Sequence, residues 1–354
     1  MTDLFEPLSI HAITLRNRIG VSPMCMYSYS DGFSNDWQVT HLGARAAGGA
    51  GLVIAEATAV EPRGRITAHD VGIWSDAHID GHRRVTRVIK ASGAVAGIQI
   101  AHAGRKAGSR RPWESPKPVG QEESHGWQGL GPSPIAFSQD YAVPHEMSVQ
   151  EIKEVQNAFC AAAQRALAAG FEWLELHAAH GYLIHSFYSP LSNQRTDEYG
   201  GSFENRIRFL LETIRAIRPV WPEQLPLTVR ISGTDWQEGG WTVDESVRLA
   251  RHLKTEGVDL IDCSSGGGVA QARIPFGPGY QLPISEAIRS GAEILTAAVG
   301  LITLPAQADE IIRQGQADLV LLGRELLRDP YWPLHAAQVL KQPAPIPPQY
   351  LRAF

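Results

Sequence analysis

The stretch that decides the fold is Ser148–His177, SVQEIKEVQNAFCAAAQRALAAGFEWLELH, in which an amphipathic pattern leads almost directly into a short strand-like run. Ser148 followed by Glu151 has the form of a capping box and predicts where a helix begins. Gly170 predicts where it ends, because glycine readily adopts the left-handed backbone that follows a helix. The next run, Trp173–His177, predicts a strand, so the stretch is one helix–strand unit of an alternating α/β chain.

The same alternation continues along the whole chain. Several apolar runs are nearly continuous in Val, Ile and Leu, as expected for strands buried on both faces of a parallel sheet. The predicted strands are Ile19–Met24, Leu52–Val60, Val95–His102, Trp173–His177, Leu227–Ile231, Leu260–Ser264, Ile294–Val299 and Leu319–Gly323. The clearest predicted helices are Ser148–Ala169, Phe203–Val220, Thr242–Glu256 and Leu304–Gln314. This α/β pattern predicts a single (β/α)8 TIM barrel; a doubly wound sheet is the alternative, but no GxGxxG follows the first strand.

Three segments exceed a minimal barrel. Leu8–Arg18 alternates well enough to predict an N-terminal hairpin that caps the bottom of the barrel. Gly104–Met147 is rich in Pro, Gly, Ser and Trp and predicts a long loop after the third strand, forming a lid or substrate loop. The tail, residues 343–354, is proline-rich and is expected to be extended. Because no linker-like break divides the chain, we expect residues 1–354 to form one domain.

Composition narrows the class of protein. The chain has 354 residues, of which 44% are hydrophobic and 19% charged, and this is enough for a large core. Its 32 Lys and Arg against 37 Asp and Glu give a net charge of −5, which argues against nucleic acid or an anionic membrane as a partner. The 3 cysteines include no CxxC pair, which argues against a disulfide framework and an iron–sulfur cluster. With no signal peptide and no membrane-length apolar stretch, we expect a soluble cytoplasmic enzyme.

Polar and small residues gather at the predicted carboxyl ends of the strands, where a barrel carries its active site. The loops after strands seven and eight form the usual phosphate site of a barrel, so Gly300, Gly323 and Arg324 predict a phosphorylated ligand. Gln99 and Arg230 would suit the polar edge of a ring on that ligand. In chain order, the strand ends carry Cys25, Tyr27, Glu56, Gln99, His177, His180, Tyr182, Arg230, Gly300, Gly323 and Arg324.

The pair His177 and His180 allows three interpretations. A metal-dependent barrel lyase or hydrolase would use both as ligands together with Glu56, although no spaced motif is complete. They could instead be hydrogen-bonded strand-end histidines without a chemical role. We favour neutral imidazoles that donate hydrogen bonds to a carbonyl or an oxyanion, with Tyr182 as a proton donor beyond them. Cys25 is either a nucleophile, for which the sequence offers no partner, or a small buried hydrophobe.

With these residues in place, the chain resembles the Old Yellow Enzyme family of FMN-dependent ene-reductases over nearly its whole length. A cysteine at the end of the first strand makes it most similar to the branch that includes bacterial xenobiotic reductases. The motifs that carry the resemblance are Tyr199–Arg206 (YGGSFENR), His177–Tyr182 (HAAHGY), Ile98–Lys106 (IQIAHAGRK), Pro23-Met24-Cys25 and Arg208–Glu212 (RFLLE). From its physical pattern, we expect the longer stretch Arg195–Arg206 to be mostly structural, with Asn205 and Arg206 tying loops to the barrel.

The resemblance implies FMN at the mouth of the barrel and no metal. It also implies that NADPH or NADH drives reduction of the C=C bond of alkenes activated by a carbonyl or nitro group, by ping-pong hydride transfer. Enones, enals, maleimides and quinones are such alkenes. The implied FMN contacts are Pro23, Met24, Cys25, Ala57, Gln99, His177, Arg230, Val299, Gly300, Gly323 and Arg324.

Each side chain at the site has an implied role. His177 and His180 bind the oxygen of the substrate, and Tyr182 protonates its α-carbon after hydride has reached the β-carbon. Cys25 lies beside the flavin and tunes its potential, and Tyr27 lines the substrate pocket. A flavin-binding protein without turnover is the non-catalytic alternative, against which the complete set of His177, His180 and Tyr182 argues.

The tail is implied to reach the active site of a neighbouring subunit, where Arg352, close to Tyr350, would contact the substrate. We therefore expect a homodimer or homotetramer with shared sites. Val299 lies in a stretch where a close relative has Trp, and the smaller residue predicts a wider pocket. Arg105 and Lys106 are candidates for favouring NADPH as the hydride donor.

Overall fold

The predicted strands close into a barrel in the computed structural model, which describes residues 2–115, 118–119 and 126–353. The strands pair in parallel in the order β10-β11-β12-β3-β4-β5-β8-β9. They are β3 (Ile19–Val21), β4 (Leu52–Ala59), β5 (Val95–Ala101), β8 (Trp173–Ala178), β9 (Leu227–Ser232), β10 (Leu260–Ser264), β11 (Leu295–Ala298) and β12 (Leu319–Leu322). The TIM-barrel prediction is confirmed, and the doubly wound alternative is wrong.

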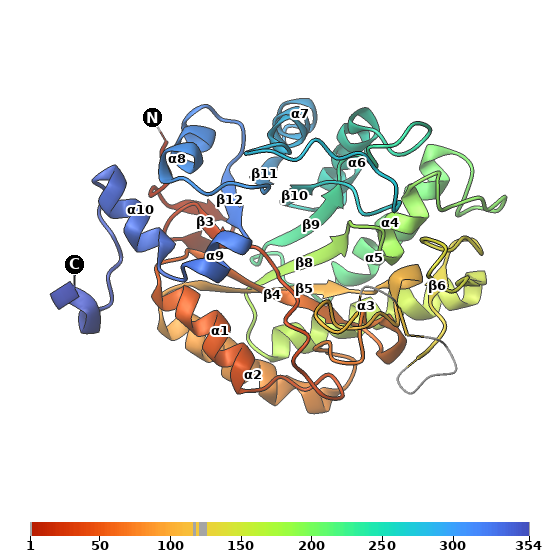
Figure 1. Cartoon of the computed structure of the whole chain (residues 1–354), viewed down its shortest axis with the longest axis horizontal. Coiled ribbons are helices and arrows are strands. Elements are labelled where there is room, and N and C mark those ends of the chain that lie inside the picture. The colour runs from red at the N-terminus through yellow and green to blue at the C-terminus, as the bar shows by residue number, and fades with distance from the viewer. Residues whose placement is uncertain (1, 116–117, 120–125, 354) are drawn as a thin grey trace.

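Helices surround the barrel (Figure 1). They are α1 (Asp36–Ala47), α2 (Ile79–Ala91), α3 (Val149–Ala168), α4 (Leu183–Tyr188), α5 (Phe203–Ile217), α6 (Val243–Thr255), α7 (Leu282–Ala292), α8 (Pro305–Arg313), α9 (Arg324–Arg328) and α10 (Trp332–Leu340). The capping box of α3 forms as predicted: the N–H of Glu151 donates to Ser148 Oγ, and the N–H of Ser148 donates to the Glu151 carboxylate. Gly170 follows that helix with φ +89°. The deciding stretch is therefore one helix–strand unit, α3 and β8.

The bottom of the barrel is closed by the predicted hairpin, which consists of β1 (Leu8–Ile10) and β2 (Ile13–Leu15). Its apolar side chains pack with the lowest side chains of the strands in one buried cluster. The cluster contains Leu8, Ile10, Leu15, Leu52, Ile54, Val95, Trp173, Leu260, Ala297, Leu319 and Leu321. Because apolar side chains fill this end, the polar side chains of the strands gather at the opposite, carboxyl end.

The long segment after β5 contains structure of its own. It begins with the 3-10 helix η3 (Gly104–Lys106) and later forms a small sheet of β6 (Leu130–Gly131) and β7 (His145–Glu146). The N–H of Ser109 donates to the carbonyl of Ile66 at 2.7 Å, which ties its start to the loop after β4. That loop contains the 3-10 helices η1 (Pro62–Gly64) and η2 (Asp76–His78). Residues 116–117 and 120–125 of the predicted Gly104–Met147 loop lie outside the described residues.

The C-terminal tail corrects one prediction. The sequence predicts an extended tail, but residues Pro348–Ala353 form the 3-10 helix η4; Phe354 lies outside the described residues. Proline-rich sequence predicts extension because proline has no N–H to donate. The N–H of Tyr350 is available as soon as the prolines end, and it donates to the carbonyl of Pro347 at 2.8 Å. Figure 1 shows η4 standing away from the barrel beyond α10.

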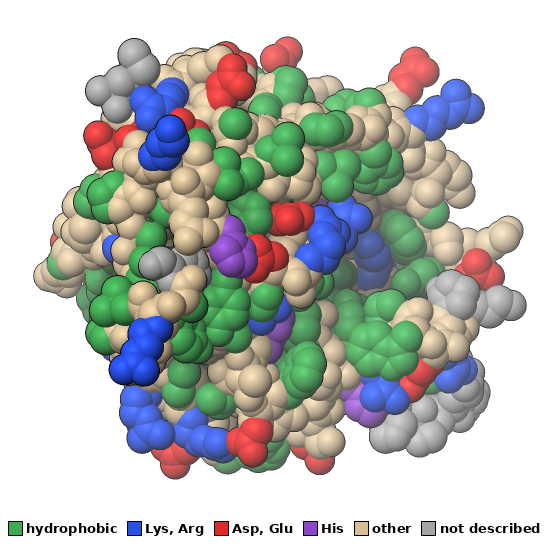
Figure 2. Space-filling view, turned by 60° about the vertical axis from the view of Figure 1, so that its left-hand side comes forward, with side chains coloured by type: hydrophobic (Ala, Val, Ile, Leu, Met, Phe, Trp, Pro, Cys, Tyr) green, Lys and Arg blue, Asp and Glu red, His purple; other side chains and the backbone are tan. Residues whose placement is uncertain are grey.

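The surface carries charges of both signs. On the face shown in Figure 2, acidic and basic side chains are interspersed rather than separated into fields of one sign. This pattern agrees with the small net charge of −5. In the part of the chain that the structure describes, no helix has the length and apolarity needed to cross a membrane.

Candidate active site

A pocket of about 330 Å³ opens at the carboxyl ends of the strands. The predicted site residues that line it are Pro23, Met24, His180, Arg230, Val299, Gly300, Gly323 and Arg324. It is also lined by residues that the sequence analysis missed: Ser22, Ser264, Tyr280, Gln281, Thr303 and Arg328. Ser22 and Ser264 could have been found because they stand at strand ends. Tyr280 and Gln281 come from the long loop after β10, and their positions carry no such signal.

One end of this pocket suits an anion. Gly300 lies two residues after β11, Gly323 follows β12 directly, and Arg324 and Arg328 come from α9. Gly300 has φ +132°, and a Cβ there would lie 2.9 Å from a side-chain nitrogen of the β10 loop. Glycines beside guanidinium groups are the donor set that a phosphate requires. Arg328 is ion-paired with Glu325, so Arg324 is the chief candidate for the phosphate of FMN, which this end fits.

Inside the barrel, four buried polar side chains lie at the level of the pocket floor. Gln99 Nε2 donates to Glu175 Oε1 at 2.8 Å, and Gln99 does not itself line the pocket. Arg230 Nε lies 3.0 Å from Asp262 Oδ2, and Arg230 Nη1 donates to Ser22 Oγ at 3.2 Å. Since the Gln99 amide donates to Glu175, its oxygen is left to accept from a ring N–H. Arg230 faces the pocket as a donor to a ring oxygen or nitrogen.

The charge of this floor is nearly balanced. Burial, helped by Asp262, raises the pKa of Glu175 to about 8, even though Arg230 opposes it. Burial raises the pKa of Asp262 to about 6. At neutral pH the group therefore contains one guanidinium, one carboxylate and one largely protonated carboxyl. Glu175 and Asp262 therefore bring little net repulsion against a ring that gains negative charge beside Arg230.

His177 and His180 face each other at the end of β8. The N–H of Ala179 donates to His177 Nδ1 at 3.1 Å, so we assign the proton of His177 to Nε2. His177 Nε2 lies 3.3 Å from His180 Nδ1, and His180 Nε2 lies 2.7 Å from Ser264 Oγ. Burial, with Arg230 nearby, lowers the pKa of both histidines well below the ordinary value. Two neutral imidazoles can therefore hold an acceptor oxygen between Nε2 and Nδ1.

Tyr182 stands next to these histidines. Its ring centroid lies 4.9 Å from that of His177, with the rings at 88°. It packs in an apolar cluster with Cys25 and Tyr27, and it shares a small cavity with Ala57. Burial raises the pKa of the Tyr182 hydroxyl well above its usual value, so Tyr182 holds its proton at neutral pH. Burial likewise raises the pKa of the Cys25 thiol, which argues against a thiolate nucleophile.

Arg105 and Lys106 are engaged inside the molecule. Arg105 donates to two backbone carbonyls, one of which belongs to Gly268. Lys106 Nζ donates to the carbonyl of His180 at 2.9 Å and lies 5.2 Å from the centroid of the Tyr182 ring. Burial, together with Arg105, lowers the pKa of Lys106 to about 8. Both cations therefore support the active-site loops, which argues against a role in selecting the phosphate of NADPH.

The Glu56 side chain accepts hydrogen bonds from two residues of the loop after β3. Its Oε2 accepts from the N–H of Met26 at 2.7 Å, and its Oε1 accepts from the hydroxyl of Tyr29. The pairing of β4 with β5 shifts register between Ala55 and Thr58, and such an irregularity redirects a side chain. Burial raises the pKa of Glu56 to about 8. Among the described residues no group of three His, Cys, Asp or Glu could hold a metal ion, so the metal-dependent alternative gains no support.

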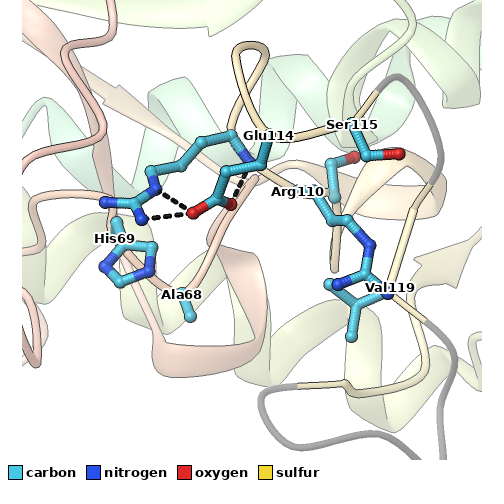
Figure 3. Close-up of a pocket in the computed structure, with 8 residues that line it drawn as sticks. Ala68, His69, Arg110, Glu114, Ser115 and Val119 are labelled. Atoms are coloured by element: carbon cyan, nitrogen blue, oxygen red, sulfur yellow. Dashed lines mark hydrogen bonds and ion pairs between the residues drawn. The ribbon is translucent and has the colours of Figure 1, made fainter.

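A second pocket, of about 400 Å³, lies between the loop after β4 and the segment after β5. The Trp113 ring contacts Tyr27 on one side, at 6.2 Å between centroids, and Arg111 on the other. Figure 3 shows His69 and Arg110 facing this pocket from opposite sides. Its full lining is Ala68, His69, Ser109, Arg110, Arg111, Glu114, Ser115 and Val119.

The predicted tail residue Arg352 is not brought to this site within its own chain. It is exposed on η4, which stands outside the barrel wall in Figure 1.

Comparisons with known proteins identify the family. The model of the NADH:flavin oxidoreductase / NADH oxidase family matches residues 3–342. The NADPH dehydrogenase of Geobacillus sp. (strain WCH70) is 50% identical over 100% of this chain and 99% of its own. That of Bacillus subtilis (strain 168) is 48% identical over 99% of each chain. The solved structure of morphinone reductase in complex with tetrahydroNAD matches with a TM-score of 0.79 and 26% identity, covering 99% of this chain and 94% of that one.

These matches agree with the site described above. The predicted FMN cofactor and NAD(P)H donor are confirmed by the family, and the prediction of an NAD(P)H-dependent flavin oxidoreductase is confirmed with them. The chain belongs to the NADH:flavin oxidoreductase / NADH oxidase family, the Old Yellow Enzyme family that its motifs resemble.

Proposed function

We propose that this enzyme reduces the C=C bond of alkenes activated by a carbonyl or nitro group, with NADPH or NADH as hydride donor. One observation carries the proposal. His177 Nε2 and His180 Nδ1 face each other at 3.3 Å, and the Tyr182 ring lies 4.9 Å from the His177 ring. Two neutral donors for one oxygen beside a protonated phenol suit a substrate that must be polarised and then protonated. Enones, enals, maleimides, quinones and nitroalkenes meet that description.

Two features at the mouth of the barrel support FMN as the cofactor of this reaction. When bound, FMN supplies the hydride chemistry of a ping-pong reaction, accepting hydride from NAD(P)H and delivering it to the β-carbon of the alkene. The anion-binding end fits the phosphate, and Arg230 and Gln99 suit the polar edge of the ring. The residues that would hold FMN are Pro23, Met24, Cys25, Ala57, Gln99, His177, Arg230, Val299, Gly300, Gly323 and Arg324.

His177 and His180 bind the oxygen of the substrate in this proposal. The Nε2–H of His177 already points toward His180 Nδ1. For both rings to donate to one oxygen, the proton of His180 moves from Nε2 to Nδ1. Ser264 Oγ, 2.7 Å from His180 Nε2, accommodates both forms, because a hydroxyl group accepts from an N–H and donates to a bare nitrogen. The two bonds draw electron density away from the alkene and expose the β-carbon to hydride.

Tyr182 then gives its proton to the α-carbon. Its hydroxyl is protonated at neutral pH because burial raises its pKa. The phenolate left behind is offset by Lys106, whose ammonium lies 5.2 Å from the ring centroid. Tyr27, in the same apolar cluster, lines the substrate space, and Cys25 tunes the flavin as a neutral thiol.

The quaternary structure is part of the same proposal. Residues 1–354 form one catalytic domain, and two or four copies share their sites as a homodimer or homotetramer. Arg352 would contact the substrate of a neighbouring subunit. The position of η4 supports this, since it stands away from its own barrel.

The test is an anaerobic titration of the purified flavoprotein. We expect the yellow flavin absorbance to bleach on addition of NADPH and to return on addition of cyclohexenone. A protein that binds no FMN contradicts the proposal, as does a reduced flavin that neither cyclohexenone nor a maleimide reoxidises.

A further inference from the structure

Below the active-site turn lies a buried histidine–carboxylate pair that the proposed reaction does not use. His185 on α4 and Asp235 in the loop after β9 both have 0% exposed surface, and His185 Nε2 lies 2.9 Å from Asp235 Oδ1. The backbone of Gly268 covers the pair so closely that a Cβ there would lie 2.6 Å from Asp235 Oδ1. Neither side chain can touch a substrate, so any role in the reaction acts through another group.

The hydrogen bonds around the pair assign its protons. The N–H of Gly181 donates to His185 Nδ1 at 2.7 Å, so the proton of His185 is on Nε2, facing Asp235. Asp235 Oδ2 also accepts from the hydroxyl of Ser189 at 2.6 Å and the N–H of Trp241 at 2.8 Å. Burial alone would raise the pKa of Asp235, but His185, Ser189 and Trp241 outweigh it and hold the pKa below its ordinary value. Asp235 is therefore a carboxylate that accepts from Ser189 and Trp241 and faces His185 Nε2 at 2.9 Å.

The Gly181 N–H belongs to the turn that carries His180 and Tyr182. His180 has φ +60° and Gly181 φ +76°, two left-handed residues in succession. A non-glycine residue in this region is strained and persists only where its surroundings hold it. A Cβ on Gly181 would lie 2.1 Å from the carbonyl oxygen of Gly267, so the turn also packs tightly against the loop after β10.

Three groups hold the polar backbone atoms of this turn. The N–H of His180 donates to Ser232 Oγ at 2.9 Å, and the carbonyl of His180 accepts from Lys106 Nζ at 2.9 Å. The third bond, from Gly181 to His185, is the one closest to Tyr182 in the chain. If His185 carried its proton on Nδ1, that contact would become a donor facing a donor.

We propose that His185 and Asp235 are positioning residues for alkene reduction: Asp235 fixes the tautomer of His185, and His185 anchors the peptide N–H between His180 and Tyr182. The inference rests on the proposed function, because it gives His180 and Tyr182 their roles with the alkene. The pair resembles a catalytic dyad in geometry, but it acts on the backbone of the active-site turn and not on a substrate.

The sharpest test is Asp235→Asn. The amide has one oxygen and one NH2, so it cannot accept from His185, Ser189 and Trp241 together. If the NH2 faces His185, the proton of the imidazole moves to Nδ1 and the bond from Gly181 is lost. We expect reoxidation of the reduced flavin by cyclohexenone to slow by about 10- to 100-fold, as is typical when a supporting partner is removed. Flavin reduction by NADPH should change much less, because it needs no proton from Tyr182.

Ser189→Ala is the matched control. It removes another donor to Asp235 and leaves the tautomer of His185 in place, so both half-reactions should stay within about threefold of wild type. The rates of both half-reactions are measured for each variant well below its melting temperature. The dissociation constant of cyclohexenone for the oxidised enzyme is measured as well. A role in stability alone would lower the melting temperature of Asp235→Asn and leave its half-reactions and this constant unchanged; that result overturns the inference.

Two substitutions at His185 test the same bond if Asp235→Asn does not fold. His185→Asn keeps an acceptor for the Gly181 N–H without any tautomer, whereas His185→Leu removes the acceptor. We expect only the leucine variant to lose alkene reduction selectively, and equal behaviour of the two overturns the inference. Failure of the proposed function is distinguishable, since wild-type enzyme would then fail to reduce cyclohexenone at all.

Discussion

At the residue scale, the mouth of this barrel keeps most of its ionisable side chains uncharged. Burial lowers the pKa of His177 and His180 and raises those of Tyr182, Cys25 and Glu56. Neutral imidazoles donate hydrogen bonds without bringing net charge, and a protonated phenol remains available as an acid. The charged exceptions are Lys106, beside Tyr182, and the groups at the floor and at the phosphate end, where a flavin carries its own negative charge.

The state of Glu56 predicts how stability depends on pH. Its folded pKa of about 8 lies above the ordinary 4.5, so the folded state binds the proton more tightly. The stabilisation is complete below pH 4.5 and is lost as pH rises through 8, at up to about 1.4 kcal/mol per pH unit. Glu56→Gln should therefore flatten the fall in the free energy of urea unfolding between pH 6 and pH 8. The exposed Glu154→Gln is the control, and an unchanged slope in Glu56→Gln would contradict the assignment.

Arg324 is predicted to hold the phosphate of FMN. Arg324→Gln should weaken FMN binding by about 2 kcal/mol, or roughly 30-fold, because one charge-assisted hydrogen bond is lost. The measurement is the dissociation constant of FMN for apoprotein, from flavin fluorescence quenching. Arg313→Gln, on the outer helix α8, should bind FMN like wild type. Equal affinity of Arg324→Gln and wild type would remove this residue from the phosphate site.

Much of the site is visible in the sequence because strand ends can be located. His177, Arg230 and Gly323 stand at or next to the ends of apolar runs, and the barrel rule assigns them to one mouth. The residues that set the charge and tautomer of these side chains are harder to recognise in the sequence. Asp262 is buried within its strand, and Gln281 lies in a loop whose path no local pattern specifies. Their contacts arise only when distant strands close into a barrel.

At the element scale, local rules predict the regular parts well. Every predicted strand and helix has observed ends within three residues of the predicted ones, because capping boxes, glycines and apolar runs act locally. The structural role expected for Asn205 and Arg206 also agrees with the contacts. Asn205 Nδ2 donates to the carbonyl of Gly200, and Arg206 bonds the carbonyl of Tyr188 and pairs with Glu245.

Elements outside the strand–helix alternation are harder to predict. Helix α4 is only 6 residues long and is fully buried, so it lacks the amphipathic period that marks the other helices. The helix η4 follows a proline-rich run, and its Tyr350 contacts Tyr331, the residue before α10. Short elements of this kind are specified by their tertiary surroundings and not by sequence pattern.

The capping box of α3 gives an element-scale prediction. Ser148→Ala removes the side-chain acceptor for the N–H of Glu151 and should lower the free energy of unfolding by about 1 kcal/mol. The catalytic half-reactions should not change, because Ser148 does not line the active-site pocket. Ser290→Ala, on the exposed side of α7, is the matched control and should have little effect on urea unfolding. Equal loss in both variants would contradict a capping role.

At the scale of the whole molecule, the three segments that exceed a minimal barrel lie in different parts of the structure. The hairpin closes the bottom, the segment after β5 borders the mouth, and η4 at the end of the tail stands outside the barrel wall. Among the described residues of η4, Pro348–Ala353, none is buried within its own chain, which suits a partner subunit. This arrangement supports the proposed sharing of sites between copies.

Shared sites can be tested with mixed subunits. Arg352→Ala and Tyr182→Phe should each lower cyclohexenone reduction when expressed alone. In a randomly mixed dimer, about a quarter of the sites combine an intact Tyr182 with an intact Arg352 from the other copy, so activity should recover toward that fraction. A mixture no more active than the mean of the two variants would show that Arg352 does not act across subunits.

The most direct test of the central claim is the pair of half-reactions in Tyr182→Phe, followed by anaerobic stopped-flow absorbance of the flavin. We expect reduction by NADPH within about threefold of wild type, and reoxidation by cyclohexenone slowed at least 100-fold, the usual contribution of a positioned general acid. Unchanged reoxidation by cyclohexenone would contradict the claim that this enzyme reduces activated alkenes with Tyr182 as the proton donor.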